Sequence, residues 1–368
     1  MTSLKKTILH PLHERLGAKL VAFGDWHMPI SYQSVLKEHE IVRTAAGIFD
    51  VSHMGEIFVA GDEAEKFLQY VTINDVSRLE PGKGQYTAML NEKGGMVDDL
   101  ILYQVEKNRY LLCVNASNDK KDYDWLLAHA GPFDVTVTHE SDKWSQIAIQ
   151  GPTSKLLLSH ILDAEDEKAA LELAYTGILR TKFFGHEGYI ARTGYTGEVG
   201  YELYISHNSA TRVFEALLEG GAVPIGLGAR DSLRLESCYL LYGNDMNDSV
   251  SPIEAGIGWA TKVDKGDFIG REIVQQHKKE PTSRRKMLAF LMEDKGIARH
   301  DMPIFSGDKQ VGVVTSGGFL PSLQKAGGLA LISDAALTIN SEVAIMVRGK
   351  KKLARLMGKP LYSAKVKS

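Results

Sequence analysis

The chain has 368 residues, of which 44% are hydrophobic and 24% are charged, and its formal net charge is -3. This length exceeds what one ordinary hydrophobic core serves, so we expect two or three domains. The slightly negative charge excludes a protein that binds nucleic acid over its whole surface, although a local basic patch stays possible.

Targeting and redox features favour the cytoplasm. The first residues, "MTSLKKTILHPLHERLG", lack the long apolar core of a secretion signal, and no run of about 18 apolar residues could span a bilayer. Cys113 and Cys238 show no C-x-x-C spacing, so neither a disulfide framework nor a zinc ribbon is indicated. We expect buried free thiols in a reducing compartment, with a processed organellar form as the alternative.

The first part of the chain alternates helical and strand patterns. A helix is expected from near Ser34 to Gly47, and an amphipathic helix in "DEAEKFLQYVTI". Strands are expected at residues 49–51, 56–59, 85–90, 100–105 and 110–115. Short turns dominate between them, which favours antiparallel sheets with helices on one side over a doubly wound parallel sheet.

The later part repeats this style and then changes. "KWSQIAIQGP" and "TKFFGHEGYIARTGYTGEVGYELYI" are rich in strand signals, and "SATRVFEALLEGG" predicts a covering helix. From about Lys279 the charged connector "KKEPTSRRK" leads into short strands separated by glycine-rich turns. This pattern predicts a separate small β domain that reaches the C-terminus. Spacing leaves open whether the earlier part is one domain or two interwoven ones.

Two adjacent aspartates stand at the mouth of an apolar strand in "NEKGGMVDDLILYQV", residues 91–105. The segment 91–95 has good turn chemistry, so one interpretation is a hairpin whose acids solvate its rim. The other starts from the alternation of strand residues, which turns Asp98 and Asp99 to opposite faces, so that one of them points inward.

An arginine begins a predicted helix in "GLGARDSLRLESCYLLYGND". Gly226 and Gly228 suggest a dinucleotide fingerprint, but Asp231 holds the third glycine position, which excludes it. A helix starting after Gly228 would place Arg230 in its first turn, against the helix dipole, so an acidic group should compensate. Arg230 either forms a buried ion pair or holds a planar anionic or carbonyl-rich ligand.

The segment "ARTGYTGEVGYELYI" combines glycines with hydrogen-bonding side chains. Glycines allow a ligand to approach the backbone, and Tyr195 offers a ring face and a hydroxyl. Glu202 follows in an alternating strand, where a carboxylate among aromatic residues suits the donor-donor edge of a pterin or purine. The alternative is a tyrosine-rich hairpin that serves packing alone.

Metal chemistry is not indicated. His10 and His13 form an H-x-x-H pair, but no second ligand pair follows at zinc-like spacing. His53 in "DVSHMGE" is a lone histidine at a strand-turn junction, which we interpret as structural. We therefore expect no metal.

The chain resembles the glycine cleavage T-protein family of folate-dependent aminomethyltransferases, collinearly over nearly its whole length. The matching segments are "LGAKLVAFGDWHMPISY", "GIFDVSHMGEI", "TINDV", "GKGQYTAML", "GGMVDDLILY", "RTGYTGEVGYE", "GLGARDSLRLE", "LYGNDM", "PIEAGIGW" and "TSGGFLPSL".

The resemblance implies an α+β fold, a three-domain cloverleaf around a central folate channel. It implies a discontinuous first domain of residues 1–54, 113–143 and 240–278. The second, folate-binding domain is expected at 55–112 with 144–239, and a C-terminal β-barrel-like domain at 279–368.

The implied reaction moves the methylene of an aminomethyl group from the lipoyl arm of an H-protein to tetrahydrofolate, and releases ammonia. The lipoylated H-protein and tetrahydrofolate are thus the expected partners of a monomer, with no nucleic acid and no membrane.

Matched position by position, the family's essential acid falls on Asp99, which leaves Asp98 as the acid of the rim. The carboxylate that grips the pterin falls on Glu202, and the ligand arginine on Arg230. Further binding positions implied by the resemblance are Tyr86, Asn115, Tyr195, Tyr239 and Arg348.

Two segments depart from the family pattern, "FGDWHMPISY" and "GGLALISDAAL". The first bears on the channel entrance and the second on packing and partner contacts of the C-terminal module. The basic tail "VRGKKKLARLMGKPLYSAKVKS" is either a solvated end or a surface that steers an acidic partner.

Alternative functions on the same fold are a folate-dependent demethylase, the folate domain of a sarcosine-type oxidase, and a non-enzymatic scaffold of the iron-sulfur-assembly type. The oxidase normally adds a flavin domain, for which this chain has no dinucleotide-binding segment. The scaffold proteins contain a K-G-C-Y-x-G-Q-E motif where this chain has "RTGYTGEVGYE".

Overall fold

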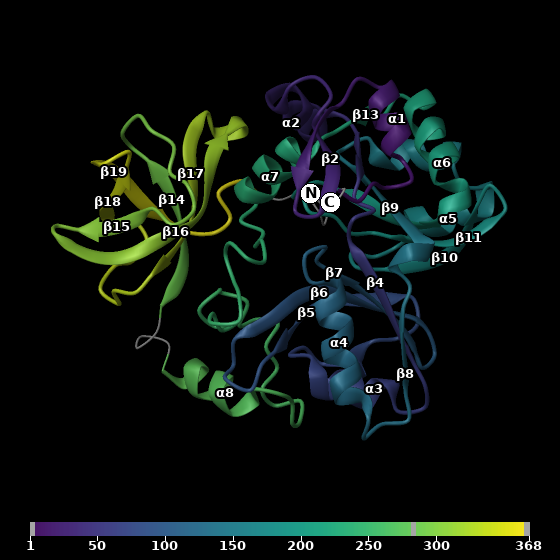
Figure 1. Cartoon of the computed structure of the whole chain (residues 1–368), viewed down its shortest axis with the longest axis horizontal. Helices are drawn as coiled ribbons and strands as arrows, with labels where there is room; N and C mark the ends of the chain where they lie inside the picture. The colour runs from purple at the N-terminus through teal and green to yellow at the C-terminus, as the bar shows by residue number, and fades with distance from the viewer. Residues whose placement is uncertain (1–3, 281–284, 364–368) are drawn as a thin grey trace.

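A computed structural model describes residues 4–280 and 285–363. Two mixed units and a barrel surround the middle of the molecule (Figure 1). None of the helices in the two described ranges has the length and apolar character needed to cross a bilayer.

The first unit is a six-stranded sheet in the order β10-β11-β12-β9-β3-β13, antiparallel except for the parallel pair β3 and β13. Its strands are β3 (Gly47–Asp50), β9 (Trp144–Gln150), β10 (Ile178–Phe183), β11 (His186–Ala191), β12 (Gly200–Ser206) and β13 (Val223–Pro224). The helices of this unit are α1 (His10–Arg15), α2 (Val35–Thr44), α5 (Ala164–Leu171), α6 (His207–Glu219) and α7 (Leu227–Glu236).

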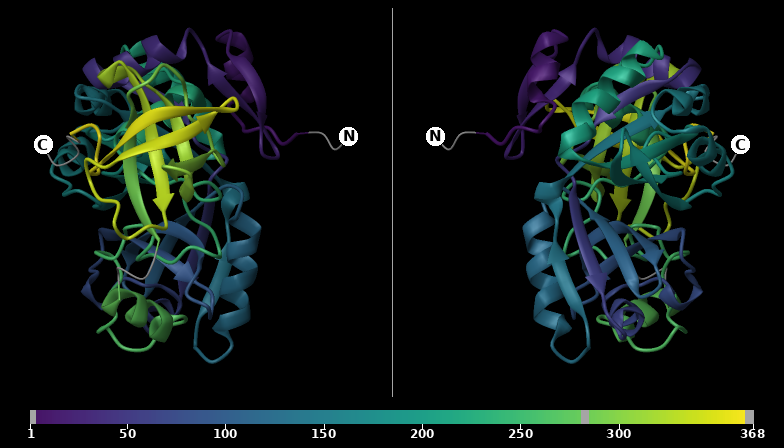
Figure 2. Two further views of the ribbon diagram at one scale, coloured as in Figure 1. Left: turned by 90° about the vertical axis from the view of Figure 1, so that its left-hand side faces the viewer. Right: turned by 90° about the vertical axis from the view of Figure 1, so that its right-hand side faces the viewer.

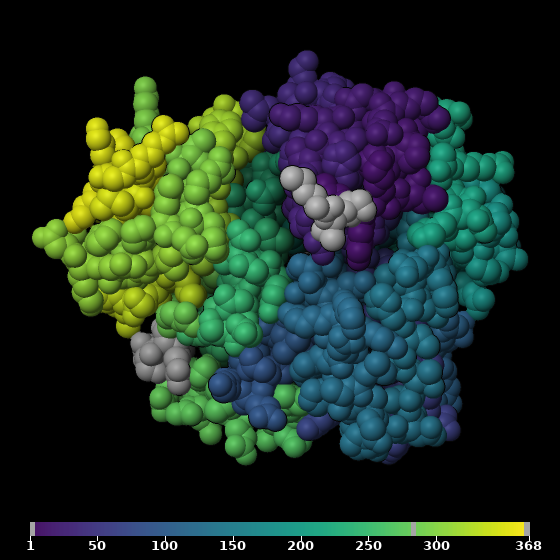
Figure 3. All heavy atoms as spheres, viewed as in Figure 1, coloured from purple at the N-terminus to yellow at the C-terminus, as the bar shows by residue number. Residues whose placement is uncertain are grey.

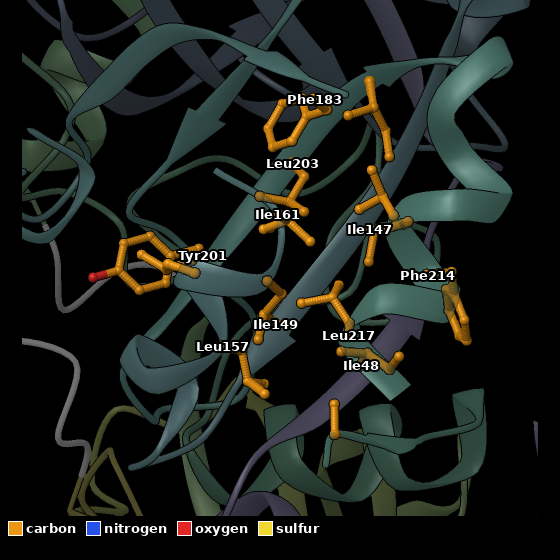
Figure 4. Close-up of a cluster of buried hydrophobic side chains, with 14 of the residues drawn as sticks. Ile48, Ile147, Ile149, Leu157, Ile161, Phe183, Tyr201, Leu203, Phe214 and Leu217 are labelled. Carbon is orange, nitrogen blue, oxygen red and sulfur yellow. The ribbon is translucent and has the colours of Figure 1, made fainter. Parts of the chain in front are cut away.

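One face of this sheet packs against α6 and its neighbours. Tyr201 and Leu203 of β12 meet Ile147 and Ile149 of β9 and Phe214 of α6 in a fully buried apolar cluster (Figure 4). Because strand residues alternate, the side chains at even positions of β12 turn to the other face.

The second unit is an antiparallel five-stranded sheet in the order β5-β6-β7-β4-β8, covered on one face by two helices. Its elements are β4 (Gly55–Ala60), α3 (Ala64–Val71), β5 (Lys83–Leu90), β6 (Met96–Glu106), β7 (Arg109–Val114), α4 (Asp119–Ala130) and β8 (Thr136–His139). Its other face meets the first unit, since Tyr103 and Phe58 share a buried cluster with Tyr189 and Tyr204.

The turn between β5 and β6 follows its sequence prediction. The Asn91 side chain accepts hydrogen bonds from the backbone N–H groups of Lys93 (3.0 Å) and Gly95 (3.1 Å). A Cβ at Gly95 would lie 1.8 Å from the Asp248 carbonyl oxygen, so only glycine allows this close approach.

An N-terminal hairpin of β1 (Lys19–Phe23) and β2 (Trp26–Ser31) lies on the same side of the molecule as α4 (Figure 2). The segment 240–279, which ends in α8 (Arg271–Lys279), lies between the barrel and the five-stranded unit (Figure 3). Both cysteines are buried free thiols, as expected.

The C-terminal unit is a closed antiparallel barrel in the order β14-β17-β16-β15-β18-β19. Its strands are β14 (Lys286–Met292), β15 (Pro303–Ser306), β16 (Lys309–Leu320), β17 (Lys325–Ile332), β18 (Glu342–Val347) and β19 (Lys350–Met357). Ser316 of β16 contacts Arg234 of α7 at 3.0 Å, which joins the barrel to the first unit. The predictions of antiparallel sheets and of a barrel-like end are confirmed.

Sheet pairing corrects the expected division of the first two domains. The boundary at 113 falls inside β7, and β8, expected with 1–54, pairs instead with β4. Residues 144–239 supply the strands that extend β3. The chain passes from the six-stranded sheet to the five-stranded sheet just after Asp50. The local sequence there does not indicate which later strands join each of the two sheets.

Candidate functional site

Asp99 lies on the face of the five-stranded sheet that meets the first unit. β6 pairs with β5 so that Tyr86 stands opposite Ile101, and Ala88 opposite Asp99. The Tyr86 hydroxyl donates to Asp99 Oδ2 at 2.9 Å, and the Asn115 amide donates to Oδ1 at 2.9 Å. Three of the predicted site residues therefore meet through direct hydrogen bonds.

Asp98 occupies the opposite, helix-covered face and is fully buried. It accepts hydrogen bonds from the Asn115 backbone (3.1 Å), the Asn115 side chain (2.9 Å) and the Asn118 side chain (2.6 Å). The two acids diverge, as strand alternation predicts. The interpretation of Asp98 as a solvated rim acid is wrong, because α4 and the residues before it enclose this carboxylate.

A second buried acid, Asp122, lies beside Asp98. Burial, and then the charge and hydrogen bond of Asp98, raise the pKa of Asp122 well above its ordinary range. The raised pKa favours the neutral form of Asp122 at pH 7. Asp98 itself accepts its three amide N–H donors from Asn115 and Asn118.

The environment of Asp99 moves the pKa of its carboxyl group toward 7. Burial and then the charge of Asp98 raise the pKa of Asp99 to about 7, while the hydrogen bonds from Tyr86 and Asn115 act in the opposite direction. A carboxylate with this pKa can take up and release a proton near pH 7, which is what general base catalysis requires.

Glu202 faces the same interior from the first unit. Its neighbours Tyr201 and Leu203 are anchored in the apolar cluster on the far side of β12, so Glu202 must turn the other way. The Thr193 hydroxyl donates to Oε2 at 2.7 Å, and the Gln146 amide donates to Oε1 at 3.2 Å. Each oxygen keeps a further lone pair, so the carboxylate can still accept two hydrogen bonds from a ligand.

Arg230 is the arginine of α7 without an ion pair in the described ranges. Its guanidinium lies 4.6 Å from the centre of the Tyr195 ring. The expected buried ion pair belongs to Arg234, which contacts Asp231 and Asp245, each at 2.8 Å.

The start of α7 differs from its prediction by two residues, since the helix begins at Leu227. The compensating acid is Glu38, whose side chain accepts a hydrogen bond from the Gly226 backbone at 2.8 Å. It supplies negative charge at the helix N-terminus, where that charge is stabilising.

A group of tyrosines joins these charges. The rings of Tyr195 and Tyr239 lie 5.8 Å apart. Burial is the main cause that raises the pKa of Tyr195. The charge of Arg230 lowers this pKa, and the charge of Asp99 raises it. The structure thus brings together the predicted residues Asp99, Tyr86, Asn115, Glu202, Arg230, Tyr195 and Tyr239.

Arg348 is not part of this arrangement. It is exposed in the turn between β18 and β19, and Lys351 from the same hairpin donates to the Gly307 carbonyl at 2.7 Å. From the adjacent start of β16 to Ser316, which contacts Arg234, the strand runs for about 23 Å. Its predicted binding role has no contact to support it.

Residue-by-residue matching missed Trp259 and Tyr175. The Trp259 ring stacks on Tyr86 with 5.8 Å between ring centres, yet 64% of this tryptophan is exposed. An exposed tryptophan beside a site tyrosine is typical of a ligand contact, and "GIGW", which places it after a turn, was the available signal. Tyr175 hydrogen-bonds with Tyr239 and is close enough to Glu202 to feel its charge.

The histidines serve other contacts. His13 Nε2 lies 2.8 Å from Asp50 Oδ2, and His10 Nε2 lies 2.9 Å from His27 Nδ1. Burial and then Arg230 lower the pKa of His53 to about 4, so that histidine is neutral at pH 7. Across residues 4–280 and 285–363, no group of three or more side chains is gathered as metal ligands.

Two family models cover most of this chain. The GCVT N-terminal domain matches residues 9–265, and the glycine cleavage T-protein C-terminal barrel domain matches residues 285–363. The chain belongs to the glycine cleavage T-protein family.

Relatives of this family match from end to end. An aminomethyltransferase of Bacillus pumilus is 45% identical over 364 residues, which cover 98% of this chain and 99% of the relative. An aminomethyltransferase of Desulforamulus reducens is 42% identical over 373 residues, with both chains fully covered. The crystal structure of the glycine cleavage system aminomethyltransferase T from Bartonella henselae superposes with a TM-score of 0.91 at 33% identity, covering 99% of both chains.

The T-protein family accounts for the architecture described above. Its barrel model begins at residue 285, next to the first strand of the closed barrel, Lys286–Met292. The family is one of aminomethyltransferases, so the sequence prediction of a transferase is confirmed.

Proposed function

We propose that this protein transfers the methylene of an aminomethyl-lipoyl carrier protein to tetrahydrofolate, with release of ammonia. The observation that supports this proposal is Asp99, a carboxylate that is hydrogen-bonded by Tyr86 and Asn115 and titrates near neutrality. The T-protein family, to which the chain belongs, supplies the reaction class.

The reaction needs a base near the acceptor. Two bonds of the methylene carbon break, one to the amino nitrogen and one to the lipoyl sulfur, and two bonds to folate nitrogens form. The two protons lost from those nitrogens end on ammonia and on the sulfur. Asp99 can take the first of these protons and pass it on, since its pKa lies near 7.

Asp99 also favours the cationic character of the transferred carbon. When the amino group departs, the carbon becomes iminium-like, and a nearby carboxylate stabilises its positive charge. This interaction gains strength in a low-dielectric interior, where water does not screen it.

The remaining cluster suits the pterin. Glu202 retains acceptor positions for the amino and ring N–H groups, and Arg230 has no ion pair within the described ranges to compete for its donors. The predicted roles of Tyr195, Tyr239 and Asn115 in folate binding belong to this proposal as well.

Three further expectations also stay predictions. The protein should act as a monomer, partner with a lipoylated H-protein, and reside in the cytoplasm. The demethylase and scaffold alternatives lack a specific supporting observation, and the family's aminomethyltransferases favour the main proposal.

A reconstituted assay tests the proposal. Purified protein is mixed with aminomethylated lipoyl carrier and tetrahydrofolate, and ammonia and methylenetetrahydrofolate are measured together. We expect both products in equal amounts. Absence of both with an active carrier would defeat the proposal, and product formation from a simple methylamine donor without carrier would favour the demethylase.

A further inference from the structure

The two carboxylate oxygens of Glu202 are held by two separate pairs of residues. Thr193 Oγ1 lies 2.7 Å from Glu202 Oε2, and the Tyr103 hydroxyl lies 3.0 Å from Thr193 Oγ1. Gln146 Nε2 lies 3.2 Å from Glu202 Oε1, and the Cys113 sulfur lies 3.6 Å from Gln146 Oε1. All of these side chains are buried. Glu202 is therefore the common end point of two buried pairs.

The direction of each hydrogen bond follows from the protons available. The hydroxyl of Thr193 has one proton, which it donates to Glu202, so Tyr103 must donate to Thr193. The Cys113 thiol donates to the amide oxygen of Gln146, which leaves the amide N–H group for Glu202. Burial, and then the charge of Glu202, raise the pKa of both Tyr103 and Cys113, so both keep their protons at pH 7. Every one of these donors therefore points toward the carboxylate, and donors in series strengthen one another.

The outer member of each pair comes from the other unit. Glu202, Thr193 and Gln146 belong to the first unit, whereas Tyr103 lies on β6 and Cys113 on β7 of the five-stranded unit. The contacts of 3.0 Å and 3.6 Å therefore cross from one sheet to the other.

The strands that supply these outer residues also hold the candidate base. β6 carries Asp99 and, four residues later on the same face, Tyr103. β7 carries Cys113, and Asn115, which donates to Asp99, follows two residues later. A movement of the sheets that changes the separation of Asp99 and Glu202 would therefore also stretch both contacts between the sheets.

We propose that Tyr103 and Cys113 are positioning residues for Glu202. Each acts through the residue between, and together they keep the carboxylate at a fixed separation from Asp99. The inference rests on one part of the proposed function, the binding of the pterin of tetrahydrofolate by Glu202. A carboxylate that is already aligned loses less conformational freedom when the ligand binds, so alignment strengthens binding. Alignment also sets where the folate nitrogens meet Asp99, and reaction rates depend strongly on such distances.

The alternative role of Tyr103 and Cys113 is packing alone. Both belong to the buried cluster that joins the two units, together with Phe58 and Tyr189. Tyr189 packs in this cluster with 6.4 Å between its ring centre and that of Phe58. Phenylalanine in place of either tyrosine keeps the ring, so a packing role predicts the same small effect at both positions.

Calorimetric titration of the whole protein with tetrahydrofolate tests the proposal. Tyr103→Phe removes the hydroxyl, so the affinity should fall about fivefold, as expected for one hydrogen bond. Thr193→Val removes the donor to the charged group and should weaken binding about tenfold. Thr193→Ser keeps a hydroxyl and should bind like wild type, as should the control variant Tyr189→Phe.

Double variants show through which residue each effect passes. Tyr103→Phe combined with Thr193→Val should bind no more weakly than Thr193→Val alone, because Tyr103 acts through Thr193. Cys113→Ala should weaken binding about twofold, since a thiol is a weak donor. This loss should multiply with that of Tyr103→Phe, because the two residues act on different oxygens of Glu202.

Two results would overturn the inference and leave packing as the role. The first is a Tyr103→Phe variant that binds as tightly as Tyr189→Phe, and the second is losses in Tyr103→Phe and Thr193→Val that multiply. Wild type that binds tetrahydrofolate without turning over the aminomethylated carrier would defeat the proposed function, and the binding data would still decide the inference. Wild type that does not bind tetrahydrofolate would overturn both.

Discussion

The adjacent residues Asp98 and Asp99 lie on opposite faces of the five-stranded sheet, and their surroundings differ. On the helix-covered face, Asp98 is fully buried and accepts three N–H donors. On the other face, Asp99 has a tyrosine and one amide as partners and a pKa near 7. A carboxylate whose oxygens are fully hydrogen-bonded serves the structure, whereas a carboxylate with fewer hydrogen bonds stays available for reaction.

The same contrast separates the two arginines of α7. Arg234 is buried against two aspartates and fixes the barrel to the first unit. Arg230 lies over the ring of Tyr195. In both pairs, the group with fewer partners belongs to the candidate site.

Replacing Asp99 should have the largest effect. Asp99→Asn removes the proton acceptor while preserving side-chain size, so turnover should fall on the order of 10²-fold or more, with little change in stability. Rates in the reconstituted assay and urea unfolding check both parts. Asp267→Asn, at an exposed position, is the control. A variant with full rate would remove Asp99 from the mechanism.

Asp98→Asn should reverse that pattern. The new amide points N–H groups at donors from Asn115 and Asn118, leaving buried polar groups unsatisfied, which costs about 2 kcal/mol of unfolding free energy. Turnover of the folded fraction should fall much less than in Asp99→Asn. Denaturant titration measures the loss, and an unchanged midpoint would contradict the assigned role of this face.

On the opposing sheet, Glu202→Gln should weaken tetrahydrofolate binding by about tenfold, because an amide offers one acceptor oxygen in place of a charged pair. Calorimetric titration measures the affinity. Glu187→Gln, on the exposed part of β11, is the matched control. Unchanged affinity would make Glu202 a packing residue of the tyrosine-rich hairpin.

The pH profile should show the smallest effect. Asp99 acts as a base only when ionised, so the rate should rise as the pH increases through about 7. Asp98→Asn removes a nearby negative charge, which lowers the pKa of Asp99 and moves this limb to lower pH by roughly one unit. Turnover rates measured between pH 5 and 9 show where the rate rises. If the rate rises over the same pH range in wild type and in Asp98→Asn, the charge of Asp98 does not influence the pKa of Asp99.

Much of the site could be predicted from sequence, because local rules determine it. Alternation in "MVDDL" sends Asp98 and Asp99 to opposite faces, and alternation in "YELYI" turns Glu202 away from Tyr201 and Leu203. The turn at Asn91 and the barrel-like C-terminal module also follow from local composition. Family resemblance then added the role of Asp99, which periodicity alone leaves open.

Long-range pairing decided the rest. No pattern near β8 indicates that it pairs with β4, nor that Asp122 of α4 would lie close enough to Asp98 for the Asp98 charge to raise its pKa. Trp259 meets Tyr86 through packing between segments far apart in the chain. Sequence determines which face a side chain takes, because that depends on its own backbone. The tertiary structure determines what lies opposite, because that depends on how distant strands and helices bury their apolar surfaces together.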